Sequence, residues 1–255
     1  MSSQELAKAG LNVDSLREYL ISKAENHNCY KHYSSLERIE GMIESGCIYL
    51  SQGREWEDYE DRAGFNNWSS DCVNFAKCFS FSRSENVAMW LLYSRAGGAM
   101  LDLTSQVVKS VKEIEFLRLG KFENGHFANH KTLRRAKQEF SIRFIDVLYR
   151  GESDHPGMVT VKRSDERAEL DANILKKCQE SIVLKSYPWS YENECRLIVS
   201  VPREVLGEFD VDDMLEVSLG LDEKYLRERV INFPGKSARN RYRASSLKGL
   251  MLDRS

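Results

Sequence analysis

Two carboxylates stand directly before an apolar run in the stretch Ser186-Tyr187-Pro188-Trp189-Ser190-Tyr191-Glu192-Asn193-Glu194-Cys195-Arg196-Leu197-Ile198-Val199-Ser200-Val201. Side chains on a strand alternate between its two faces, so Glu192 and Glu194 share one face if strand pairing extends back to them. Like charges side by side repel, and a sheet tolerates them in water or in a site that uses them. The stretch therefore predicts either a solvated strand edge, with Arg196 as a local counter-ion, or a functional site.

Aromatic residues surround this carboxylate pair in the sequence. Tyr187, Trp189 and Tyr191 alternate with other residues just before the first carboxylate. Such rings can wall a cleft and exclude water from a carboxylate, which changes its pKa. The aromatic residues favour the functional interpretation of the pair.

The whole chain reads as one continuously folded unit. At 255 residues it is long enough to bury a substantial core, and its 4 prolines and dispersed glycines mark no linker. We find no repeat and no low-complexity tract. We therefore expect a single domain over residues 1–255, with an N-terminal helix in 1–27 and a basic C-terminal segment in 224–255.

The start of the chain and its cysteines bear on its environment. Met1-Ser2-Ser3-Gln4-Glu5 lacks the basic start and the apolar stretch of a signal peptide, and the longest apolar runs are too short to cross a bilayer. The 6 cysteines form no Cys-x-x-Cys pair and have no His-rich surroundings, so they predict neither a zinc site nor a disulfide framework. We expect a cytoplasmic protein with reduced cysteines, no bound metal and no membrane contact.

Charge is balanced overall but uneven along the chain. The formal net charge is −2 at pH 7, yet residues 224–255 hold nine basic residues and only two acidic ones. Within that segment Arg239, Arg241 and Arg243 flank Tyr242, a composition typical of a surface that contacts phosphates and stacks on bases. The segment predicts nucleic acid as a partner. A second basic cluster, in a predicted helix, is more typical of a solvated face: Lys131, Arg134, Arg135 and Lys137.

The hydrophobic pattern predicts a mixed architecture. One amphipathic helix is expected at 12–26, and a second follows a capping serine at 34 or 35 and ends at Gly46. Strands near both ends, with helices between them, indicate an α+β fold rather than a doubly wound α/β fold. The other expected elements are helices at 86–93, 132–149 and 167–179, strands at 29–33, 47–50, 78–82, 99–103, 113–118, 181–185 and 196–201, and loops at 52–70 and 152–166.

The order of several short motifs resembles the ADP-ribosyltransferase superfamily. A His-x-Ser at a first strand, a Phe-x-Ser strand, a buried helix carrying Tyr and a Glu-x-Glu on a late strand follow one another. The surrounding sequence also resembles, more closely, a widespread bacterial domain family that long lacked an assigned function, over roughly Cys29 to Val201. The matching residues are His32 with Ser34, Ser80 with Ser82, Tyr93, and Glu192 with Glu194.

The resemblance implies an ADP-ribosyltransferase-like fold, a split pair of small antiparallel sheets with flanking helices, that binds NAD in the cleft between the sheets. It implies that His32 holds the adenosine-side ribose, that Ser34 or Tyr33 binds nearby, and that Tyr93 flanks the nicotinamide. It also implies that Ser80 and Ser82 belong to the same cofactor pocket. Tyr93 departs from the family's usual placement, because it follows a helix rather than a strand.

The chemistry of this reaction suits a pair of carboxylates. Breaking the bond between ribose C1 and nitrogen passes through an oxocarbenium-like transition state, which a carboxylate hydrogen-bonded to the 2-hydroxyl stabilises. The resemblance implies that Glu194 is the catalytic carboxylate. Glu192 is expected to orient or deprotonate the acceptor.

Several functions remain open from the sequence. The first is an enzyme that transfers ADP-ribose from NAD to RNA or DNA. Such an enzyme would act as a cytoplasmic bacterial toxin that an antitoxin neutralises, or as an antiviral defence effector. A variant of it is an NAD hydrolase. The main rival is a non-catalytic nucleic-acid-binding module on a decayed enzyme fold, which needs neither His32 nor Glu194. A metal-dependent nuclease is disfavoured, because the acidic residues of 55–61 have no histidines nearby in the sequence.

Overall fold

The structure is a computed structural model, and it describes residues 2–53, 71–94, 97–123, 126–178, 182–208 and 212–232. Its helices are α1 (Ser2–Ala9), α2 (Val13–Glu25), α3 (Leu36–Ser45), α5 (Val87–Met89), the π-helix η1 (Trp90–Ser94), α6 (Gln106–Lys112), the 3-10 helix η2 (Arg135–Lys137), α7 (Ala172–Cys178), the 3-10 helix η3 (Tyr187–Glu192), α8 (Arg203–Leu206) and α9 (Glu223–Glu228). Its strands are β1 (Tyr30–Ser35), β2 (Cys47–Leu50), β3 (Cys72–Ser80), β4 (Gly98–Leu103), β5 (Phe116–Glu123), β6 (His126–Arg134), β7 (Ser141–Asp146), β8 (Leu148–Gly151), β9 (Met158–Arg163), β10 (Glu166–Asp171), β11 (Leu184–Ser186), β12 (Glu194–Pro202), β13 (Met214–Ser218) and β14 (Val230–Asn232).

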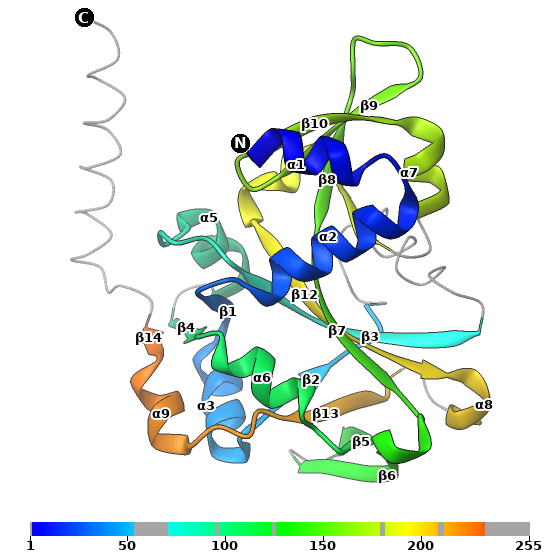
Figure 1. Cartoon of the computed structure of the whole chain (residues 1–255). Coiled ribbons are helices and arrows are strands. Elements are labelled where there is room, and N and C mark those ends of the chain that lie inside the picture. The colour runs from blue at the N-terminus through cyan, green and yellow to red at the C-terminus, as the bar shows by residue number, and fades with distance from the viewer. Residues whose placement is uncertain are drawn as a thin grey trace, which may run out of the picture.

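A six-stranded antiparallel sheet, in the order β14-β4-β1-β3-β12-β7, forms the centre of the fold (Figure 1). The apolar run that follows the carboxylates is β12, between β3 and β7. Leu197 and Val199 join one hydrophobic core, whereas Ile198 joins a second core on the opposite face. Because both faces of β12 are covered, apolar residues follow one another along it without alternation.

Two four-stranded sheets cover these faces. The sheet β2-β13-β5-β6 closes the first core, to which it contributes residues such as Leu50 and Leu215. The sheet β10-β9-β8-β11 closes the second core together with α1, α2 and α7, through residues such as Leu20 and Leu170. Figure 1 shows α1 and α2 beside this second sheet. The N-terminal segment is therefore part of the packed fold, and it contains two helices where the sequence predicted one.

Capping residues set the ends of α2 and α3, the two helices that the sequence predicted most clearly. Asn12 accepts a hydrogen bond from the Ser15 backbone N–H at 2.8 Å and so caps α2. Ser35 caps α3, and Gly46 ends it in the left-handed conformation at φ 63°. These predictions are confirmed, and so is the strand β2 at 47–50.

The helix predicted at 132–149 is wrong. The segment forms the end of β6, η2, β7 and the first two residues of β8. Ile142 and Phe144 pack on one core while Ile145 packs on the other, an alternation with the period of a strand. Pairing of β7 with β12, which no local pattern shows, decides this conformation. The basic cluster that begins at Lys131 accordingly lies on β6 and η2.

Two predictions after this segment are also wrong. The polar loop predicted at 152–166 contains β9, which pairs with β10. The helix predicted at 167–179 begins only at Ala172, because the residues before it form β10. Val161 and Leu170 are both buried in the second core, and this burial stabilises the hairpin.

The mixture of helices and antiparallel sheets agrees with the predicted α+β class. Strands run through the whole described chain rather than gathering near its ends, and they form three sheets where a pair was predicted. β8 and β11 are a parallel pair. Within the described ranges, no helix has both the length and the apolar composition needed to span a membrane.

Part of the predicted C-terminal segment belongs to the sheet. Residues 224–232 form most of α9 and all of β14, which pairs with β4. The proposed nucleic-acid contacts Arg239, Arg241, Tyr242 and Arg243 lie outside the described residues, as does most of the loop predicted at 52–70.

Candidate active site

A cavity of about 460 Å³ lies against the strands β1, β3 and β12. Its volume falls within the range of roughly 300–1,000 Å³ that is usual for small-molecule clefts. The register of the sheet explains its position, because Lys31 on β1 pairs with Ser80 on β3, which in turn pairs with Glu194 on β12. Three neighbouring strands thus present polar side chains along one row.

The cavity brings together most of the site residues predicted from the sequence. Its lining includes His32, Tyr33, Ser80, Tyr93, Glu192 and Glu194. Two predicted residues are not among the lining residues. Ser34 is buried and pairs with Ala99 on the neighbouring strand, and the carbonyl of Ser82 accepts a contact from the Cys29 thiol.

The two carboxylates meet at one lysine. Lys185 Nζ donates to Glu192 Oε2 at 2.5 Å and lies 3.2 Å from Glu194 Oε2. All three side chains are buried, and Glu192 is only 2% exposed. The ammonium also lies 5.0 Å from the centroid of the Trp189 ring, which lines the cavity. Lys185 therefore offsets the repulsion that two adjacent buried carboxylates exert on each other.

Glu194 is held at its side chain and at its backbone. Arg196 Nε donates to Glu194 Oε1 at 2.5 Å, and the Glu194 N–H donates to Tyr149 Oη at 2.9 Å. Burial alone would raise the pKa of the Glu194 carboxyl, but the adjacent cations of Arg196 and Lys185 outweigh it and lower the pKa below its ordinary range. Glu194 is accordingly an anion at neutral pH.

Glu192 has the opposite electrostatic environment. Its Oε1 accepts a hydrogen bond from Tyr93 Oη at 2.6 Å, and its backbone carbonyl accepts one from Ser80 Oγ at 2.6 Å. Burial and the neighbouring Glu194 anion raise the pKa of Glu192 to about 7, although Lys185 and Tyr93 act against this rise. Two carboxyl groups whose pKa values are pushed apart are typical of a site that needs one anion and one proton carrier.

His32 borders the same cavity as a neutral ring. Burial, with the nearby Lys77 cation, lowers its pKa well below 6.5. His32 Nδ1 lies 3.2 Å from the Cys78 carbonyl oxygen, which only accepts, so Nδ1 carries the proton. The other nitrogen, Nε2, is buried and has no hydrogen-bond partner among the described residues. His32 Nε2 is therefore an acceptor that can take a hydrogen bond from a hydroxyl group.

Sequence reasoning missed two features of this site. Glu192 ends the 3-10 helix η3 and does not lie on β12, so strand alternation does not bring the carboxylates together. Asn193, at φ 45°, forms a left-handed link between them. Lys185 was not named as a site residue, although a lone cation after the apolar run Ile182-Val183-Leu184 was a usable signal.

Neither metal-ligand geometry nor similarity to known proteins adds to this description of the site. Among the described residues, no group of three or more His, Cys, Asp or Glu side chains could hold a metal ion. No family model matches the chain, and neither a curated protein nor a solved structure is significantly similar to it.

Proposed function

We propose that this protein is an NAD-dependent ADP-ribosyltransferase with a nucleic-acid acceptor. The observation that carries the proposal is the pair of buried carboxylates with opposite pKa shifts, Glu192 and Glu194, beside the neutral acceptor His32 in one cavity. The order of strands also supports the proposed ADP-ribosyltransferase-like fold, since β1, β3 and β12 are neighbours and carry His32, Ser80 and Glu194.

The charge of the cavity suits a dinucleotide. Four cationic side chains line it, against the two carboxylates, one of which is half protonated near neutral pH. A lining with excess positive charge attracts an anionic ligand such as the pyrophosphate of NAD. His32 Nε2 would accept a hydrogen bond from a ribose hydroxyl. The cationic lining residues are Lys31, Arg38, Lys185 and Arg196.

The two carboxylates would divide the chemistry between them. As the bond from ribose C1 to the nicotinamide nitrogen breaks, its electron pair leaves with neutral nicotinamide, and positive charge develops on the sugar. The Glu194 anion accepts a hydrogen bond from the 2-hydroxyl and stabilises this charge. Glu192, with a pKa of about 7, takes the proton that the acceptor releases when it attacks C1.

Tyr93 would act through both its position and its hydroxyl group. It lies on the π-helix η1, a conformation that often occurs at functional sites. Its Oη donates to Glu192, so its ring is fixed against the carboxylate at the cavity wall. This arrangement fits a ring that flanks the nicotinamide.

The nucleic-acid acceptor rests on the basic segment around Arg239, Arg241 and Arg243. Positive charge interleaved with an aromatic ring is typical of a surface that binds single-stranded nucleic acid. A toxin or an antiviral effector in the bacterial cytoplasm, with an antitoxin as partner, is the setting that this activity and the family resemblance favour. Water as the acceptor, which makes the protein an NAD hydrolase, is the alternative that the same cavity permits.

One experiment tests the activity and its acceptor together. The purified protein is incubated with NAD labelled in the adenosine part and with RNA, DNA or a protein extract, and the label in each acceptor is measured beside free ADP-ribose. We expect Glu194→Gln to lower turnover at least about a hundredfold. Glu204→Gln, the same change at an exposed position of helix α8, serves as the matched control and should keep full turnover.

A second variant, assayed in the same buffer, identifies the acceptor. Replacing Arg239, Arg241 and Arg243 with Ala should reduce transfer to nucleic acid and leave release of free ADP-ribose unchanged, because water needs no electrostatic capture. Label in the protein fraction alone would refute a nucleic-acid acceptor. Unchanged turnover in Glu194→Gln would remove the proposed mechanism.

A further inference from the structure

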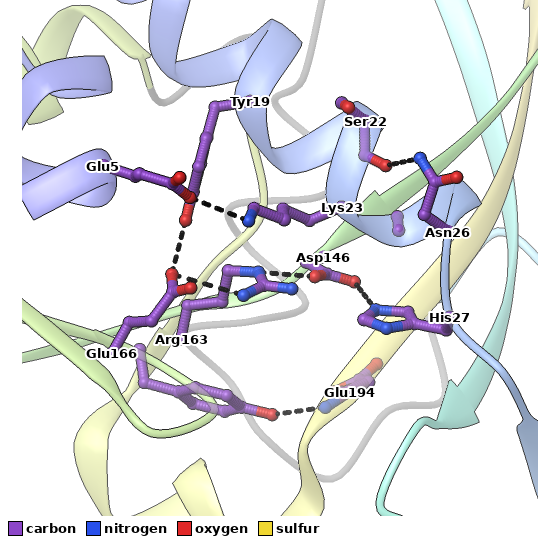
Figure 2. A network of polar contacts seen from close by, with 12 residues as sticks. Glu5, Tyr19, Ser22, Lys23, Asn26, His27, Asp146, Arg163, Glu166 and Glu194 are labelled. Atoms are coloured by element: carbon purple, nitrogen blue, oxygen red, sulfur yellow. Dashed lines mark hydrogen bonds and ion pairs between the residues drawn. The ribbon is translucent and has the colours of Figure 1, made fainter. Parts of the chain in front are cut away.

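A chain of buried and half-buried polar side chains joins residues of helix α2 and its C-terminal end to strands β7, β9 and β10, and none of its members lines the cavity (Figure 2). Tyr19 Oη donates to Glu166 at 2.5 Å, and Arg163 pairs with Glu166 at 3.2 Å and with Asp146 at 2.6 Å. At the end of the chain, His27 Nε2 lies 2.7 Å from Asp146 Oδ1. Asp146 is completely buried. The proposed reaction uses none of these five groups, so their presence needs another explanation.

His27 also contacts Phe81, the residue that directly follows strand β3. Its ring stacks on Phe81, with ring centroids 3.9 Å apart and an interplanar angle of 8°. The Phe81 backbone N–H donates to the Asn193 carbonyl at 2.9 Å. Asn193 is the left-handed link between the two carboxylates, a conformation that Asn adopts more readily than other non-glycine residues, and this hydrogen bond fixes its carbonyl group. Phe81 is therefore part of what holds the link.

Asp146 supports the same link from the other side. It pairs in register with Cys195, which directly follows Glu194. The next residue, Val147, donates its backbone N–H to the Glu194 carbonyl at 3.0 Å. The backbone that carries the carboxylates is thus held between the end of β3 and the end of β7. His27 touches both ends, one through its ring face and the other through Nε2.

We propose that His27 is a positioning residue for the carboxylate pair, which it holds in register by joining Phe81 to Asp146. The inference deepens the proposed function and relies on it for one of its two readouts. When His27 is removed, Asp146 keeps its ion pair with Arg163, so the buried acid does not lose every partner. The variant should fold, and the segment of residues 192–194 should become less constrained.

The first readout needs no enzymatic activity. The side-chain carboxyl of Glu192 is followed by ¹³C NMR in protein labelled at glutamate, and Glu192→Gln identifies its signal. Glu194, Lys185 and Tyr93 are the titratable groups that face Glu192 directly. In His27→Ala the carboxylates should separate and gain water, so the pKa of Glu192 should fall from about 7 towards the ordinary 4.5.

The second readout is turnover of NAD. We expect His27→Ala to lower kcat at least about tenfold, with KM for NAD changed less than about threefold, because the carboxylates act on the reacting bond rather than on cofactor binding. The pH at which kcat reaches half its maximum should move in the same direction as the NMR titration. If the wild-type protein does not consume NAD, the proposed function fails, and the titration still decides the role of His27.

Matched variants separate positioning from stability. Tyr19→Phe removes the distal hydrogen bond to Glu166 and leaves the contacts of His27 intact, so it should lower stability without changing the titration of Glu192. His155→Ala removes an exposed histidine and should change nothing. Should His27→Ala fail to fold, His27→Phe keeps the ring on Phe81 and loses only the contact with Asp146, and it should shift the titration part of the way. An unchanged Glu192 titration in the folded His27 variant, or an equal change in Tyr19→Phe, would overturn the proposal.

Discussion

Glu192→Gln is expected to stabilise the free protein at alkaline pH. Gln has the shape of the protonated acid, and its carbonyl oxygen still accepts the hydrogen bond from Tyr93. Lys185 loses its acceptor at Oε2, which offsets part of the gain, but it keeps its ion pair with Glu194. The pKa of Glu192 is about 7, against an ordinary value of 4.5, because the side chain is buried beside the Glu194 anion. At about 1.4 kcal/mol for each tenfold change, this difference means that the fold disfavours the Glu192 charge by about 3 kcal/mol.

The expected gain depends on pH with a definite sign. Above the folded pKa of about 7, Glu192 is charged in both the folded and the unfolded chain, so the wild-type fold bears the whole penalty. Below 4.5 the group is protonated in both states, and the penalty disappears. The variant should therefore gain about 2 to 3 kcal/mol in free energy of unfolding at about pH 8.5, and nearly nothing at about pH 4.5.

Urea denaturation at the two pH values measures this gain in free energy of unfolding. Glu194→Gln, the same substitution two residues away, is the matched control. Glu194 has a lowered pKa, so the fold favours its charge, and its removal leaves Arg196 and Lys185 short of a buried partner. We expect Glu194→Gln to destabilise the protein by about 3 kcal/mol at neutral pH, an effect that shrinks as the pH falls towards the folded pKa of Glu194. If both variants changed stability with the same sign at alkaline pH, the reasoning about the two environments would be refuted.

Four further changes have expected outcomes. His32→Ala should raise KM for NAD about tenfold and change kcat little, because its proposed contact is present in both the ground state and the transition state; steady-state kinetics at saturating NAD checks this. Tyr93→Phe removes a hydrogen bond that lowers the pKa of Glu192, so the pH profile of kcat should move to higher pH, and an unmoved profile would contradict the role of that bond. Gly120→Ala should lower the free energy of unfolding by about 1 to 3 kcal/mol, because the new Cβ would lie 1.9 Å from the Ala128 carbonyl oxygen. Gly41 lies inside helix α3, and a Cβ added there would meet no atom within 4 Å outside the backbone of its own helix. Gly41→Ala should therefore stabilise the protein in the same thermal or urea assay.

Elements decided by local contacts were predictable from the sequence. The cap at Asn12, the helix that begins after Ser35 and the glycine stop at Gly46 use side chains and backbone groups within a few residues of each other. The apolar run of β12 was equally clear, because a strand whose two faces are both covered carries apolar residues on both of them. In contrast, the sequence predicts a helix where β7 forms, since the strand conformation depends on pairing with β12, about fifty residues further along the chain.

The sequence alone also determined which chemical groups the site contains: the two carboxylates, the histidine on the first strand and the tyrosine after the short helix. Tertiary structure alone decided how these groups are arranged around one another. Lys185 comes from β11, in a different sheet, and its position between Glu192 and Glu194 depends on the packing of that sheet against β12. The opposite pKa shifts follow from burial and from distances of a few ångströms between charges, quantities that a linear pattern does not contain. Residue types can thus be read from the chain, whereas their protonation states arise only when folding excludes water and sets the distances between the charges.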